Sequence, residues 1–101
     1  MDIEKPEIVV FAGLGELFVD NYQHIVRVIG QKPDYLFDND QKKWGAIYHG
    51  KKCLNKEEML SLPENTKIVI VTRLVDIIFC QLKKFGFSNI HAVNFERSES
   101  R

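Results

Sequence analysis

The 101-residue chain is short of cysteine, has no excess of charge of either sign and contains no long hydrophobic run. Its two cysteines, Cys53 and Cys80, stand far apart and form no CxxC pair, which excludes a disulfide framework and indicates no zinc site. Fourteen Lys and Arg balance fourteen Asp and Glu, so the basic excess typical of proteins that bind nucleic acid or anionic membranes is missing. No apolar run approaches the roughly 20 residues of a membrane span, and the charged N-terminal segment lacks the apolar core of a secretory signal. We therefore expect a cytoplasmic protein with no nucleic-acid partner and no membrane span.

Short β-rich runs alternate with amphipathic stretches along the chain. The unbroken apolar run after Glu7 is typical of a strand buried on both faces of a parallel sheet. The alternation predicts strands at 7–12, 35–37, 67–71 and 89–93, and helices at 15–29, between Asn55 and Pro63, and at 73–85. Residues 41–50 are ambiguous, because Trp44, Ile47 and Tyr48 fit either a short strand or a loop that packs back on the sheet. This order predicts an α/β fold over residues 1–95, a single three-layer sandwich with a mostly parallel sheet of four or five strands and about three helices. We expect residues 96–101 to be a polar tail or the start of a linker.

The Gly13-Leu14-Gly15 segment carries the strongest functional signal, because it follows the first predicted strand and opens the first predicted helix. The first glycine of such a motif permits a tight turn, and the second lets a pyrophosphate approach the N–H groups at the positive end of the helix. The dinucleotide-binding fingerprint has a third glycine where this chain has Phe18. We expect that benzyl group to push the helix away from the strand or to rotate it. The competing interpretation is a strand-to-helix turn that needs glycine but binds nothing.

Two more residues are candidates for ligand binding. Asp38 ends the second predicted strand, about 20 residues after the glycines, where an acid binds the ribose hydroxyls in dinucleotide sites. Arg73 follows the strand at 67–71 and can meet a phosphate across the crevice at the carboxyl ends of the strands. Alternatively, Asp38 forms an acidic turn together with Asn39 and Asp40, and Arg73 is a solvated residue in the first turn of a helix.

The remaining polar residues predict neither catalysis nor metal binding. Tyr48 and Lys52 have the spacing of a dehydrogenase pair, but Gly50 between them argues against the helix that such a pair needs. The three histidines are scattered and unpaired, unlike metal ligands or an acid–base dyad. We expect Cys80 to be a packed small hydrophobe. The sequence thus predicts no catalytic residue and no metal ligand in this domain.

Taken together, the motifs follow the order of a known type of domain. They are the glycine turn, Phe37-Asp38-Asn39-Asp40, Gly45-Ala46-Ile47 with Gly50, the segment from Asn55 to Pro63, and Gln81-Leu82 followed by 86–90. From Ile8 to Val93 the chain resembles the Rossmann-like domains attached to bacterial sugar-processing enzymes, such as nucleotide-sugar acyltransferases and epimerase/dehydratases. The resemblance implies a domain that holds a nucleotide or the nucleotide part of an activated sugar in polysaccharide biosynthesis. It also implies an adjacent catalytic module in the same polypeptide.

Three functional hypotheses follow. In the first, the chain is a binding module in which Gly13, Leu14 and Gly15 receive the pyrophosphate of a nucleotide, a nucleotide sugar or NAD. Asp38 then binds the ribose and Arg73 a phosphate. In the second, the chain is part of an NAD-dependent epimerase or oxidoreductase, or of a methyltransferase, whose catalytic residues lie elsewhere. In the third, it is an interaction domain that has kept the fold and lost the site.

Overall fold

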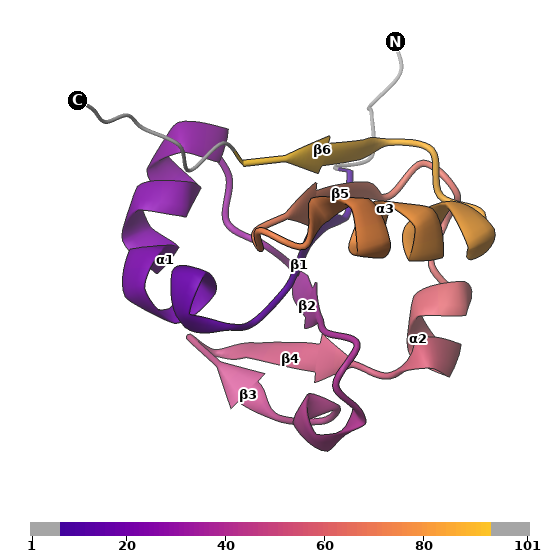
Figure 1. Ribbon diagram of the computed structural model, residues 1–101, viewed down its shortest axis with the longest axis horizontal. Helices are drawn as coiled ribbons and strands as arrows, with labels where there is room; N and C mark the ends of the chain where they lie inside the picture. Colours follow the sequence, from indigo (N-terminus) through magenta and orange to yellow (C-terminus); the bar gives the residue numbers. More distant parts are fainter. Residues whose placement is uncertain (1–6, 94–101) are drawn as a thin grey trace, which may run out of the picture.

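The computed structural model describes residues 7–93 and shows a six-stranded sheet with α-helices on both of its faces (Figure 1). The strands are β1 (Val9–Ala12), β2 (Tyr35–Phe37), β3 (Ile47–Tyr48), β4 (Lys51–Leu54), β5 (Lys67–Ile70) and β6 (Ile90–Ala92). The helices are α1 (Glu16–Ile29), α2 (Lys56–Leu60) and α3 (Val75–Lys84), with a short 3-10 helix, η1, at Gln41–Lys43. The predicted polar tail at 96–101 lies outside the described residues.

The order of the strands across the sheet is β3-β4-β2-β1-β5-β6. All neighbours pair in parallel except β3 and β4, which form an antiparallel hairpin at one edge. The α/β class and the three α-helices are confirmed. The sheet is mixed, with four parallel strand pairs and one antiparallel pair, and the prediction of four or five strands was wrong. The extra strands are β3, which lies in the ambiguous segment 41–50, and β4, which follows that segment directly. They are joined by a tight turn in which His49 and Gly50 both have positive φ, 52° and 78°.

The first strand is the central organiser of the sheet, because β2 flanks it on one side and β5 on the other. All four of its residues are buried, as expected for a parallel strand covered on both faces. Alternate residues of β1 point to opposite faces and contribute to two separate cores. The core on the α1 side comprises Val9, Phe11, Leu14, Phe18, Tyr22, Ile25, Leu36, Cys53, Val69, Val71 and Val93. The core on the α2 and α3 side comprises Val10, Ala12, Phe37, Leu54, Met59, Ile68, Ile70, Ile78, Leu82 and Phe87.

The ends of the helices follow local signals in the sequence. Gly30 caps α1 in the left-handed region, with φ 81°, and its N–H bonds to the carbonyl of Val26. At the start of α2, Asn55 and Glu58 form a complete capping box, as their spacing predicts. Helix α3 begins at Val75, two residues later than predicted, so Arg73 lies in the turn before the helix.

The prediction that Cys80 packs in the core was wrong. Its side chain is exposed on the outer surface of α3. Ile78 and Leu82 form the buried face of α3, and a residue two positions from each of them points to the opposite side of the helix.

Among residues 7–93, none of the helices combines the length and apolarity required to cross a membrane.

Candidate functional site

The glycine turn lies where the winding of the sheet reverses, at the carboxyl end of β1 between the ends of β2 and β5. Gly13 has φ 101°, and its N–H donates to the carbonyl of Phe37 at 2.8 Å. A Cβ at this position would lie 2.9 Å from the Cβ of Thr72, in the segment that follows β5. Both the backbone angle and the close approach of Thr72 therefore require glycine at position 13.

The middle of the turn is bound by Asp38. The N–H of Leu14 donates to Oδ2 of Asp38 at 2.7 Å, and Oδ1 of the same carboxylate accepts the N–H of Asp40 at 2.8 Å. The Nζ of Lys43 lies 3.7 Å from Oδ2 and donates to the carbonyl of Leu14 at 3.0 Å. The acid predicted to bind ribose thus already holds the glycine turn and the following loop in place.

The end of the turn is open. Gly15 is the N-cap of α1 with ordinary backbone angles, φ −86° and ψ −158°. Apart from its two chain neighbours, no described residue has an atom within 4 Å of the position of a Cβ there. The first N–H groups of an α-helix have no partner within the helix, and Gly15 has no side chain to cap them. They carry the positive end of the helix dipole, although Glu16 places a carboxylate in the same turn.

Phe18, which replaces the third glycine of the fingerprint, does not block the turn. Its side chain is fully buried in the core on the α1 side. The ring makes edge-to-face contacts with Tyr22, Tyr48 and His49, at centroid distances of 5.5, 6.2 and 5.7 Å. His49 in turn stacks on Tyr22 with centroids 3.9 Å apart and planes 4° apart. The β3–β4 hairpin therefore supplies the aromatic surroundings that accommodate the benzyl group.

The segment after β5 borders the crevice from the other side. Thr72 packs against Gly13, and its Oγ1 accepts the N–H of Leu74 at 3.3 Å. Arg73 is exposed next to it. The structure thus brings the glycine turn, Asp38 and the segment 72–73 to the same carboxyl edge of the sheet, as the sequence predicts. The ligand-binding roles of these residues stay predictions.

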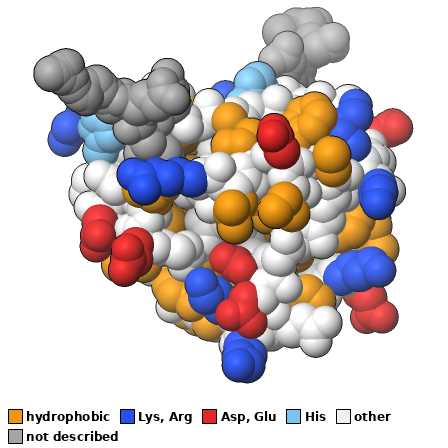
Figure 2. All heavy atoms as spheres, viewed as in Figure 1, with side chains coloured by type: hydrophobic (Ala, Val, Ile, Leu, Met, Phe, Trp, Pro, Cys, Tyr) orange, Lys and Arg blue, Asp and Glu red, His pale blue; other side chains and the backbone are white. Residues whose placement is uncertain are grey.

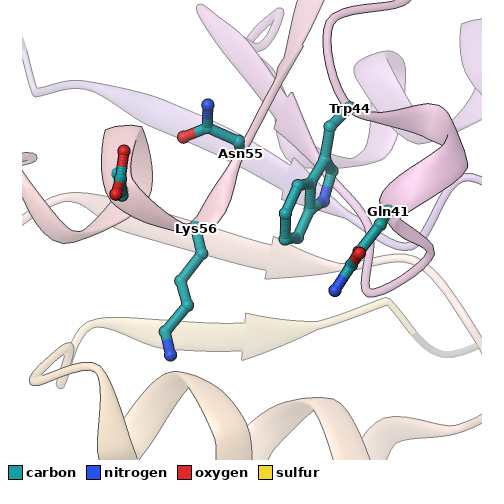
Figure 3. Close-up of a pocket in the computed structure, with 5 residues that line it drawn as sticks. Gln41, Trp44, Asn55 and Lys56 are labelled. Atoms are coloured by element: carbon teal, nitrogen blue, oxygen red, sulfur yellow. The ribbon is translucent and has the colours of Figure 1, made fainter.

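A cavity of about 320 Å³ lies at this edge between the segment that follows β2 and the start of α2 (Figure 3). The Trp44 indole forms one wall of the cavity. Figure 3 shows the side chain of Gln41 on one side of the indole and that of Lys56 on the other. Trp44 is held by a 2.7 Å hydrogen bond from Nε1 to the carbonyl of Asp38 and by stacking on Phe37, with centroids 6.5 Å apart. The complete lining is Gln41, Trp44, Asn55, Lys56 and Glu57.

Sequence reasoning missed this cavity. Its walls come from segments that are separated along the chain by the β3–β4 hairpin, and that hairpin was not predicted. The one available signal was Trp44, a large aromatic residue in a segment with no clear secondary structure.

Two titratable groups near the edge, Cys53 and Glu58, have shifted pKa values. Burial, together with the nearby charge of Asp38, raises the pKa of the Cys53 thiol to about 11, so it stays protonated and poorly reactive. A hydrogen bond from Lys52, and then one from the backbone N–H of Asn55, lower the pKa of Glu58. Within residues 7–93, His, Cys, Asp and Glu side chains form no group of three or more that could hold a metal ion.

Comparisons with models of known protein families, with curated protein sequences and with solved structures found no match.

Proposed function

We propose that this chain is a Rossmann-like module that binds a nucleotide or a nucleotide sugar at the carboxyl edge of its sheet. The observation that carries the proposal is the position of the loop that follows β2. Lys43 bonds to the glycine turn, and the next residue, Trp44, forms a wall of the 320 Å³ cavity. One loop thus contacts the glycine turn through the side chain of Lys43 and lines the cavity through the adjacent Trp44.

The two features fit the two ends of a nucleotide. A phosphate group is matched by the N–H groups of Gly15, Glu16 and Leu17, because Gly15 has no side chain to cap them and, apart from its chain neighbours, no described atom lies within 4 Å of the position of a Cβ there. A nucleobase is matched by the cavity, where the Trp44 indole offers a face for stacking and the Gln41 amide offers a donor and an acceptor.

The remaining candidates contribute from the rim. Both carboxylate oxygens of Asp38 already accept a backbone N–H group. A ribose hydroxyl would approach Oδ1, which accepts one hydrogen bond and has capacity for another. Arg73, exposed after β5, would reach a second phosphate. Glu16 works against an anion, so we expect modest affinity. In this proposal an adjacent catalytic module of a cytoplasmic sugar-modifying protein would carry out the chemistry.

Titration of isotope-labelled protein with a UDP-sugar, with NAD and with S-adenosylmethionine tests this function, with amide chemical shifts as the readout. We expect at least one ligand to shift both the amides of Gly15 to Leu17 and the indole N–H of Trp44. The three arms separate a sugar-nucleotide module from the oxidoreductase and methyltransferase alternatives. If none of the ligands moves either group, the nucleotide-binding proposal is wrong.

A matched pair of variants locates the ligand. Glu16→Gln removes the opposing charge in the first turn of α1, and we expect it to tighten nucleotide binding about threefold. Glu57→Gln removes a charge of the same sign from the lining of the cavity. A change in its affinity for the nucleotide therefore reports on the part of the ligand that carries the base. If Glu16→Gln leaves the affinity unchanged, the phosphate does not lie at the N-terminus of α1.

A further inference from the structure

Exposed apolar side chains lie on α3 and directly before it. Leu74, the N-cap, and Ile77 are each 60% exposed and stand three positions apart, so they are neighbours on one side of the helix. Phe79, which is 42% exposed, points away from Ile77 because it is two positions along. Figure 2 shows hydrophobic side chains exposed on the face of the molecule that carries α3 in Figure 1. The buried residues Ile78 and Leu82 already attach this helix to the sheet. The exposed ones are therefore not needed for packing within the described part of the chain.

The charges on the same helix are arranged by sign along its axis. Asp76 lies in the first turn, and Lys83 and Lys84 lie in the last turn. Two such helices packed side by side in opposite directions would place the acidic end of each beside the basic end of the other. Their helix dipoles would also be antiparallel, which is the favourable arrangement. In parallel packing, the like charges would face one another.

From these observations we propose that α3 is a self-complementary surface through which two copies of this chain associate about a twofold axis. Cys80 is exposed near the middle of the helix and lies close to that axis. Asp76 then faces Lys84 of the partner subunit, and the apolar side chain of Ile77 is covered by the partner helix. This arrangement is isologous, so it closes at two copies. It does not depend on nucleotide binding.

The small area of the α3 surface limits how tightly two copies can associate. A ten-residue helix is about 15 Å long, so two of them bury less than the roughly 800 Å² per partner of a standard stable interface. We therefore expect a reversible dimer with a dissociation constant between about 10 µM and 1 mM. Sedimentation equilibrium over a concentration series under reducing conditions measures it directly.

Substitution of one exposed apolar residue tests the location of the surface. Ile77→Glu places a charge in the proposed contact twice, once from each copy, and should weaken association by at least about 100-fold. Val28→Glu is the matched control, because Val28 is 57% exposed on another helix, α1, and should leave association unchanged. Thermal unfolding of both variants establishes that each is folded. A wild-type chain that stays monomeric to 1 mM, or a dimer that survives Ile77→Glu, overturns the proposal.

An exchange of charges tests the antiparallel direction. Asp76→Lys alone puts like charges opposite each other at both ends of the contact, and should weaken the dimer about tenfold. The double variant with Asp76→Lys and Lys84→Asp restores opposite charges and should recover most of that loss. Recovery is specific to two copies of this chain that meet head to tail along α3. If the double variant does not recover the affinity, the two helices do not pack in the antiparallel direction. If the chain is monomeric and its α3 surface is still protected from solvent, another segment of the chain covers that surface and the proposal is wrong.

Discussion

The carboxylate of Asp38 accepts the backbone N–H of Leu14 at 2.7 Å, across 24 residues of sequence. Asp34, at the other end of β2, accepts the N–H of Val9 at 2.9 Å in the same way. Two aspartates that flank β2 therefore hold both ends of the central strand β1. Asp38 alone also holds the glycine turn, so its geometry links the stability of the sheet to the shape of the candidate site.

Replacing these two aspartates separates the structural effect from the effect on the site. Asp38→Ala and Asp34→Ala each leave a partly buried N–H without its acceptor. We therefore expect each variant to lower the free energy of unfolding by about 1–3 kcal/mol in urea denaturation. Only Asp38→Ala should also change the amide shifts of Leu14 and Gly15 and weaken nucleotide binding. Equal effects of both variants on binding would show that Asp38 has no special relation to the site.

The two glycines of the turn should respond differently to alanine. Gly13→Ala introduces a Cβ at φ 101° and 2.9 Å from Thr72, and we expect a loss of about 3 kcal/mol of unfolding free energy. Gly15→Ala adds a methyl group in open space at ordinary backbone angles. Alanine is a poorer N-cap than glycine but loses less chain entropy on folding, and because these effects oppose each other we expect the free energy to change by less than about 0.5 kcal/mol.

Ligand binding gives the complementary result for Gly15. A methyl group there occupies the space through which a phosphate would approach the N–H groups of α1. Gly15→Ala should therefore weaken nucleotide binding about tenfold while the fold is unaffected. A variant that binds as tightly as the wild type would place the phosphate away from this turn.

The sequence predicted the parts of the structure that depend on local chemistry. The β1–α1 unit, the Gly30 cap and the capping box of Asn55 and Glu58 all follow from residues that are close together in the chain. The β3–β4 hairpin could not be predicted in the same way, because its turn uses His49 at a positive-φ position where asparagine or glycine is usual.

The candidate site could be predicted only in outline. Strand order alone brings the glycines, Asp38 and Arg73 to one edge of the sheet, since the carboxyl ends of parallel strands share it. The bond between Asp38 and Leu14 and the cavity beside Trp44 depend on how the loop after β2 folds back. Such long-range contacts leave no periodic signal in the sequence. Cys80 was placed wrongly because residue type was given more weight than position on the helix.

Acid should weaken the fold in part through Glu58. Its pKa is lowered in the folded state, so the stabilisation is present above the unfolded pKa, near 4.3, and is lost as the pH falls through the folded pKa. Glu58→Gln keeps an acceptor for the capping box but loses the ion pair with Lys52. We expect it to be less stable than the wild type at pH 7 and equally stable at about pH 2, as measured by urea denaturation. A difference that persists at the lower pH would assign the effect to the cap and not to the ion pair.

The two cysteines should differ sharply in reactivity. Cys53 is fully buried with a pKa of about 11, so only about one thiol in a thousand is ionised at pH 8, and reagent cannot reach it without opening of the sheet. Cys80 is exposed on α3. Titration with a disulfide reagent at pH 8 should therefore detect one fast thiol in the folded chain and two in urea. Cys80→Ser should remove the fast reaction, and Cys53→Ser should leave it intact while lowering stability, because serine puts a hydroxyl in place of a thiol in an apolar core. Fast reaction of both thiols would show that the β2–β4 side of the sheet opens readily, and the hairpin that surrounds Phe18 would then be the least stable part of the fold.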